Sequence, residues 1–110
     1  MIFMATYQNI SISNAYWILE NKSCIVVDIR DELSYHQGHL PRAVRFNNKL
    51  LHQIRRLEQQ HSPILLYCHQ GISSREVAQI FCDIGCTNVY SLEGGYNAWQ
   101  THNMPEQQAS

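Results

Sequence analysis

The sequence predicts a single three-layer α/β domain with a mainly parallel central sheet. The chain has 110 residues, which is an ordinary size for one domain. Short apolar runs alternate with segments of helical periodicity, the order typical of a parallel sheet covered by helices. Two of the runs, CIVV and PILLY, are almost continuously apolar, as expected of strands buried on both faces. We expect a core over about residues 8–102, followed by a polar tail, 103–110, whose last residues, EQQAS (106–110), fray.

Four runs have the composition of strands, because each is short, rich in apolar or β-branched residues and bounded by turn-forming residues. They are CIVVD (24–28), AVRF (43–46), PILLYC (63–68) and NVYSL (88–92). Four further segments have the pattern of helices. They are residues 14–20, the stripe Leu50, Leu51, Ile54 and Leu57, the stripe Val77, Ile80, Phe81 and Ile84, and residues 96–101. Ser13 is expected to cap the first and Asn47 or Asn48 the second, while Gly85 is placed to end the third in a left-handed conformation.

Composition and charge exclude several classes of protein. Eight Lys and Arg stand against nine Asp and Glu, and the longest basic run is the pair Arg55–Arg56. Such a chain lacks the basic surface of a nucleic-acid-binding protein. No stretch approaches the roughly 20 apolar residues of a membrane span, and the first residues lack the positive region of a secretory signal. We therefore expect a cytoplasmic protein that binds neither nucleic acid nor membrane.

The four cysteines are expected to be free thiols, because disulfides are uncommon in the cytoplasm. Cys24 opens an apolar run and is predicted to pack as a small hydrophobic residue. Cys82 and Cys86 are four residues apart, so they would share a helix face if the helix reaches that far. No second pair of Cys or His has zinc-finger spacing, which favours core packing over a metal site. We expect no metal and no cofactor.

Cys68 is the candidate for a chemically active residue. It ends an apolar strand and precedes an amphipathic helix, and ligands of α/β sheets bind at such carboxyl ends of strands. Ser73 and Glu76 have the spacing of a capping box, so the helix is expected to begin at Ser73 or Ser74. Gly71 would let the intervening loop curl, which aims several backbone N–H groups at the Cys68 sulfur.

This environment is expected to lower the pKa of Cys68 below the ordinary thiol value of about 8.5. Arg75, in the first turn of the helix, would add to the effect, and Glu76 would oppose it. His69 is either a base or donor at the site or an exposed loop residue. A cysteine that only packs at the strand end is the alternative, but the combination of strand, cysteine, glycine loop and helix favours a nucleophile.

Three stretches resemble, in order and spacing, the hallmark stretches of the rhodanese domain. They are VVDIRDELSYHQGHLPRAV, LLYCHQGISS and LEGGYNAW. The resemblance spans about residues 24–100, and the size is similar to that of the small single-domain bacterial rhodaneses of the thiosulfate sulfurtransferase family, including the glycerol-operon type. It implies one rhodanese domain over 1–110, with a mainly parallel sheet of about five short strands and helices on both faces.

The resemblance also implies a sulfurtransferase. The loop cysteine of this family takes a sulfane sulfur from a donor such as thiosulfate, holds it as a persulfide and passes it to cyanide or a thiol, for example glutathione or a thioredoxin-like dithiol. Carried over, Cys68 is the nucleophile. The loop residues whose amides would hold the persulfide are His69, Gln70, Gly71, Ile72 and Ser73. The residues with supporting roles would be Asp28, Arg30, Ser74 and Arg75. A simple surface ion pair or strand-end cap is an equal alternative for Asp28 and Arg30.

Two positions depart from the family pattern, and two other functions stay open. Many active rhodaneses have a basic residue at the last loop position, where this chain has Ser73, and Arg75 is expected to compensate from the helix. Arg42 replaces a frequent glycine and is expected in a surface turn. A rhodanese-like module that only binds or regulates a partner is the main alternative. Phosphatase or arsenate reductase chemistry is less favoured, because its loop needs an arginine where this chain has Ser74.

Overall fold

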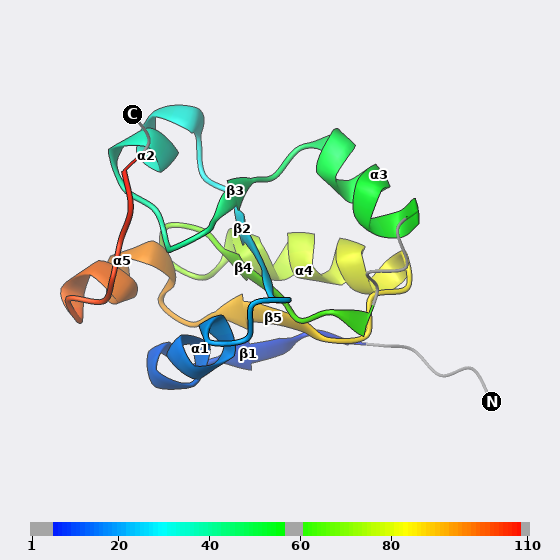
Figure 1. The fold of residues 1–110 in the computed structure, drawn as a ribbon, viewed down its shortest axis with the longest axis horizontal. Helices are drawn as coiled ribbons and strands as arrows, with labels where there is room; N and C mark the ends of the chain where they lie inside the picture. The colour runs from blue at the N-terminus through cyan, green and yellow to red at the C-terminus, as the bar shows by residue number, and fades with distance from the viewer. Residues whose placement is uncertain (1–5, 57–60, 109–110) are drawn as a thin grey trace.

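A computed structural model describes residues 6–56 and 61–108, which form one parallel sheet with helices on both faces (Figure 1). The strands are β1 (Gln8–Ile10), β2 (Ile25–Asp28), β3 (Val44–Arg45), β4 (Ile64–Tyr67) and β5 (Val89–Leu92). Their order in the sheet is β1-β5-β4-β2-β3, and every neighbouring pair is parallel. The predicted α/β class and parallel sheet are confirmed, and β4 occupies the centre.

The helices of the described residues are α1 (Ile12–Leu19), α2 (Glu32–Gln37), α3 (Asn48–Arg56), α4 (Ser73–Asp83) and α5 (Gly95–Thr101). Four of them correspond to predicted segments. The sequence patterns identified neither β1 nor α2, because a three-residue strand and a six-residue helix are too short to show a period. Asp31 caps α2 by accepting the Ser34 N–H at 2.8 Å.

The helix ends follow local hydrogen bonding. The prediction that Ser13 caps the first helix is wrong, because the Ser11 side chain accepts the Asn14 N–H and α1 begins two residues earlier than expected. Asn47 accepts the Leu50 N–H at 2.7 Å and caps α3, as predicted; Leu57 lies outside the described residues. Gly85 follows α4 with φ +108°, which confirms the predicted left-handed end.

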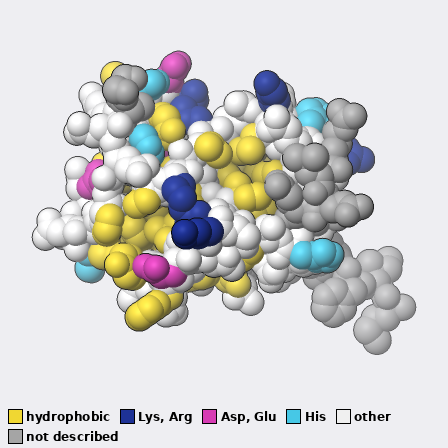
Figure 2. Space-filling model, viewed as in Figure 1, with side chains coloured by type: hydrophobic (Ala, Val, Ile, Leu, Met, Phe, Trp, Pro, Cys, Tyr) yellow, Lys and Arg dark blue, Asp and Glu magenta, His cyan; other side chains and the backbone are white. Residues whose placement is uncertain are grey.

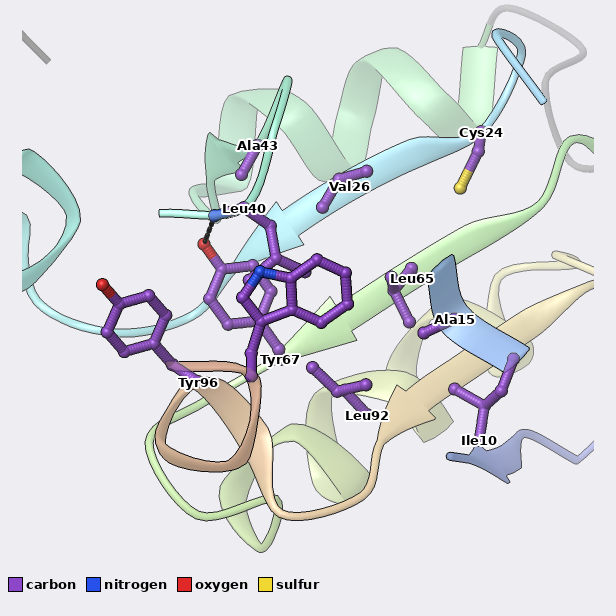
Figure 3. Close-up of a cluster of buried hydrophobic side chains, with 11 residues drawn as sticks. Ile10, Ala15, Cys24, Val26, Leu40, Ala43, Leu65, Tyr67, Leu92 and Tyr96 are labelled. Carbon is purple, nitrogen blue, oxygen red and sulfur yellow. Dashed lines mark hydrogen bonds between the residues drawn. The ribbon is translucent and has the colours of Figure 1, made fainter. Parts of the chain in front are cut away.

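Alternate residues of the central strands supply two cores, one on each face of the sheet. Val26 and Leu65 pack on the face covered by α1 and α5, where Trp99 is fully buried (Figure 3). Val27 and Leu66 pack on the opposite face against α3 and α4. This burial on both sides explains why the strand segments read as continuous apolar runs.

The end of the polar tail, EQQAS (106–110), was predicted to fray, and this is wrong for Glu106 and Gln107. Trp99 Nε1 donates to the Pro105 carbonyl at 2.8 Å. His39 and Gln107 exchange two backbone hydrogen bonds, of 2.9 and 2.8 Å. The tail is therefore held by the buried Trp99 indole and by the His39 backbone. His39 lies far away in the sequence, so the polar composition of the tail could not predict that contact.

The surface fits the near-neutral composition. On the face shown in Figure 2, the Lys and Arg side chains lie in separate small groups and form no continuous basic patch. Among residues 6–56 and 61–108, no helix has the length and apolar character needed to cross a bilayer.

Candidate functional site

The Cys68 sulfur lies inside a loop that curls around it at the carboxyl end of β4. The Gly71 N–H donates to Sγ at 3.0 Å and the Ser74 N–H donates to it at 3.4 Å. The Ser74 hydroxyl oxygen is also 3.4 Å from Sγ. Because two backbone N–H groups and one hydroxyl converge on the sulfur, the loop provides the anion cradle that the sequence predicts.

This cradle lowers the pKa of Cys68. Burial of the thiol raises the pKa, but hydrogen bonds from the Ser74 hydroxyl and from the amides of Ser74, Gly71 and Gln70 outweigh it. The other cysteines show the opposite balance, since burial raises the pKa of Cys24 and of Cys86 to about 11 and also raises that of Cys82. One of the four thiols is therefore favoured as a thiolate.

Cys24, Cys82 and Cys86 are buried free thiols, in agreement with the predicted packing role. Cys82 and Cys86 do not share a helix face, because the helix does not reach Cys86. The helix ends at Asp83, and Cys86 follows the left-handed Gly85.

At the start of α4, Ser74 contributes to the cysteine site, and neither Ser73 nor Ser74 caps the helix. The predicted capping box does not form: α4 begins at Ser73 as expected, but its N-cap is Ile72 and no side chain caps it. The fully buried Ser74 hydroxyl lies 2.7 Å from the Ser91 hydroxyl on β5. The neutral Cys68 thiol donates to Ser74 Oγ, and once the thiol has ionised the Ser74 hydroxyl can donate to the sulfur while it accepts from Ser91. Sequence reasoning missed this relay because Ser91 carries no local signal.

The two glycines after β5 anchor the cysteine loop. Gly71 has φ +85°, and a Cβ there would lie 2.8 Å from the Gly94 nitrogen. A Cβ on Gly95, whose φ is +60°, would collide with the Cys68 carbonyl oxygen and lie 2.7 Å from the His69 carbonyl carbon. The Tyr96 N–H donates to the Cys68 carbonyl at 2.8 Å. The LEGGYNAW stretch therefore sets the position of the loop.

A pocket of about 660 Å³ opens at Cys68. The other residues that line it include Arg30, His69, Gln70, Ile72, Ser73 and Asn97. Four of the five loop residues proposed from the sequence thus line one opening, and the fifth, Gly71, is buried. The His69 ring is about half exposed, with Nε2 3.8 Å from the Asp31 carboxylate. A separate apolar cavity of about 700 Å³, between α1 and α5, contains no residue of the cysteine loop.

Asp28 and Arg30 form a buried ion pair, so the surface alternative is wrong. Arg30 Nη2 donates to Asp28 Oδ2 at 2.7 Å and to the Gly38 carbonyl at 2.6 Å. The Tyr67 hydroxyl donates to the same carboxylate oxygen at 2.6 Å. Burial lowers the pKa of Arg30, but the hydrogen bond and charge of Asp28 outweigh it and raise that pKa overall. Arg30 is therefore a fixed cation beside the pocket.

Two other predicted cations lie elsewhere. Arg75 is exposed on α4 and is not among the residues that line the pocket, so it does not take the place of a basic residue at Ser73. Arg42 has φ +65° in a surface turn, as expected, and its guanidinium donates to the carbonyls of Leu19 and Lys22. The positive φ explains why glycine suits this position.

Comparisons with known proteins agree with this geometry. A family model described as a rhodanese-like domain matches residues 11–102. The thiosulfate sulfurtransferase GlpE of Shewanella oneidensis is 36% identical over 91% of this chain and 99% of that protein. The protein of the same name from Coxiella burnetii is 33% identical over 88% of this chain and 91% of that protein. The solution structure of the rhodanese-like domain of Anabaena Alr3790 is 19% identical, with a TM-score of 0.79 over 94% of this chain and 80% of that one.

Proposed function

Because the chain belongs to the family of rhodanese-like domains, we propose that it is a sulfurtransferase that carries sulfane sulfur as a Cys68 persulfide. The donor is thiosulfate or a related compound, and the acceptor is cyanide or a thiol. The observation that carries the proposal is the Cys68 sulfur held by the N–H groups of Gly71 and Ser74 at the floor of an open pocket. The names of the relatives that match nearly the whole chain support the donor.

In the first step, the Cys68 thiolate attacks the outer sulfur of thiosulfate. The new bond joins the two sulfur atoms, the bond inside thiosulfate breaks, and sulfite leaves with the bonding electron pair. The product is a Cys68 persulfide with its charge on the terminal sulfur. The curled loop stabilises this anion, since its N–H groups are fixed before the reaction and need no reorganisation.

In the second step, cyanide or a thiolate attacks the terminal sulfur of the persulfide. The acceptor becomes thiocyanate or a new persulfide, and the Cys68 thiolate leaves. The same hydrogen bonds that lower the pKa of Cys68 make it a good leaving group. A carrier that reacts with one substrate before the other gives ping-pong kinetics.

Intact mass spectrometry after incubation with thiosulfate tests the proposal. The reduced protein should gain one sulfur atom, and cyanide should remove it. Cys68→Ser should gain none, while Cys82→Ser, which loses a buried thiol remote from the loop, should label like the wild type. A wild-type chain that gains no sulfur from thiosulfate, polysulfide or mercaptopyruvate would contradict the proposal and favour the binding-module alternative.

A further inference from the structure

Residues 104–107, here called the C-terminal strap, lie beyond the part of the chain that matches the family model. Pro105 is bound to the Trp99 indole, and Gln107 is bound to the His39 backbone. The Gln107 side chain also accepts the Arg42 N–H at 3.0 Å. These contacts hold the residues on both sides of Glu106 and thereby fix the position of the Glu106 carboxylate.

The Glu106 carboxylate holds the hydroxyl of Tyr96. Tyr96 is 8% exposed, and its O–H donates to Glu106 Oε1. Figure 3 shows the Tyr96 hydroxyl pointing away from the other labelled core side chains. Burial and the neighbouring Glu106 raise the pKa of Tyr96 to about 12, so the hydroxyl keeps the proton that it donates. Gly38 leaves the space for this contact, because a Cβ there would lie 2.8 Å from Glu106 Oε1.

Tyr96 in turn contacts two parts of the cysteine site. Its ring lies over the Arg30 guanidinium, with 3.9 Å from Cζ to the ring centroid. Its backbone N–H donates to the Cys68 carbonyl at 2.8 Å. Arg30 lines the pocket, and Cys68 is its reactive group. A displacement of Tyr96 would therefore move the pocket wall and the start of the cysteine loop together.

We propose that Glu106 is a positioning residue for the Cys68 site and acts through Tyr96 on Arg30 and the cysteine loop. The inference rests on the proposed function for its effect on turnover, but its effect on the Cys68 thiol does not depend on sulfur transfer. The hydrogen bond to Glu106 is the contact that holds the outer end of the Tyr96 side chain, and both Glu106→Ala and Tyr96→Phe remove it. The ring then leaves its place over Arg30, and the N–H groups that converge on the sulfur lose their alignment.

The test is the rate of Cys68 alkylation by iodoacetamide as a function of pH, followed by mass spectrometry of the Cys68 peptide. Glu106→Ala and Tyr96→Phe should both raise the apparent pKa of Cys68 and slow alkylation at neutral pH by about threefold, in the range of one lost hydrogen bond. Glu106→Gln, whose carbonyl still accepts from the hydroxyl, should keep most of the wild-type rate. Gln108→Ala changes an exposed residue beside the strap and should match the wild type.

The double variant Tyr96→Phe with Glu106→Ala should behave like either single variant, because both remove the same interaction. In thiosulfate turnover, we expect KM for the donor to rise more than KM for cyanide, because thiosulfate brings two negative charges to the pocket that Arg30 lines and cyanide brings one. Unchanged alkylation profiles in folded Glu106→Ala and Tyr96→Phe would overturn the inference. A shifted profile in a protein whose wild type takes up no sulfur would support it and refute only the proposed function.

Discussion

Replacing Ser74 with alanine removes one hydroxyl from the Cys68 cradle and leaves the Ser74 backbone N–H in place. The hydroxyl lies 3.4 Å from the sulfur and is the largest of the contributions that lower the pKa of Cys68. The variant should therefore have a higher Cys68 pKa, and below that pKa less of the protein should be thiolate at any given pH.

The size of the change follows from the strength of the bond. A hydrogen bond to a charged group contributes about 1.5–3 kcal/mol, and about 1.4 kcal/mol corresponds to one pKa unit. The pKa of Cys68 should rise by about one to two units. Well below the wild-type pKa, the alkylation rate should fall by about tenfold for each unit.

Ser74→Ala also affects stability, because the fully buried Ser91 hydroxyl loses its partner. An unpaired buried hydroxyl costs about 1–3 kcal/mol of unfolding free energy. The double variant Ser74→Ala with Ser91→Ala removes both hydroxyls and should recover most of that loss. Its Cys68 pKa should nevertheless stay as high as in Ser74→Ala, which separates the effect on the thiol from the effect on the fold.

The assay combines pH-dependent alkylation of Cys68 with urea unfolding for the wild type, both single variants and the double variant. If folded Ser74→Ala kept the wild-type Cys68 pKa, the assignment of the hydroxyl as a thiolate donor would be wrong. The reasoning would also be wrong if the Cys68 pKa returned to the wild-type value in the double variant, together with its stability.

Two further predictions concern the supports of the site. Gly95→Ala should slow Cys68 alkylation and sulfur uptake, because its Cβ meets the Cys68 and His69 backbone. The control Gly85→Ala, also at positive φ but remote from the loop, should lower stability and leave the reactivity of Cys68 unchanged. If both variants lost Cys68 reactivity equally, the prediction would be wrong. Asp28→Asn should lower the urea-derived unfolding free energy by about 3–5 kcal/mol, because it leaves the buried Arg30 charge unpaired. The control is Glu32→Gln, which removes an exposed pair with His36 and should change the unfolding free energy by less than about 1 kcal/mol. A loss as small as this for Asp28→Asn would argue against a buried ion pair.

Local patterns predicted the centre of the molecule well. The strand before Cys68 and the left-handed end of α4 at Gly85 are set by neighbouring residues, which is why their sequence patterns were informative. The lowered pKa of Cys68 follows from the same short segment. The thiol and its Gly71 amide donor could therefore be named before the fold was known, whereas the Ser74 amide, which also donates to the sulfur, was not among the amides named.

What the sequence did not predict depends on contacts between distant segments. Ser91 reaches Ser74 because β5 pairs with β4, and Tyr96 reaches Cys68 because α5 begins beside the loop. The Ser73–Glu76 capping pattern was misleading, since the adjacent Ser74 is drawn to the sulfur and Ile72 precedes the helix. The contact between Glu106 and Tyr96 had no sequence signal at all.

The position of β5 has a consequence for how the chain acquires its reactive thiol during synthesis. Among the described strands, β1 pairs with β5 alone, through partners such as Gln8 and Tyr90. A ribosome-bound chain that has just exposed Cys68 lacks the Gly94–Gly95 turn, the Ser91 hydroxyl and a partner for β1. Pairings between such distant segments form late, because closing long loops is slow. Because the Ser91 hydroxyl and the Gly94–Gly95 turn belong to β5 and the residues that follow it, the supports of the Cys68 cradle are complete only once β5 has joined the sheet.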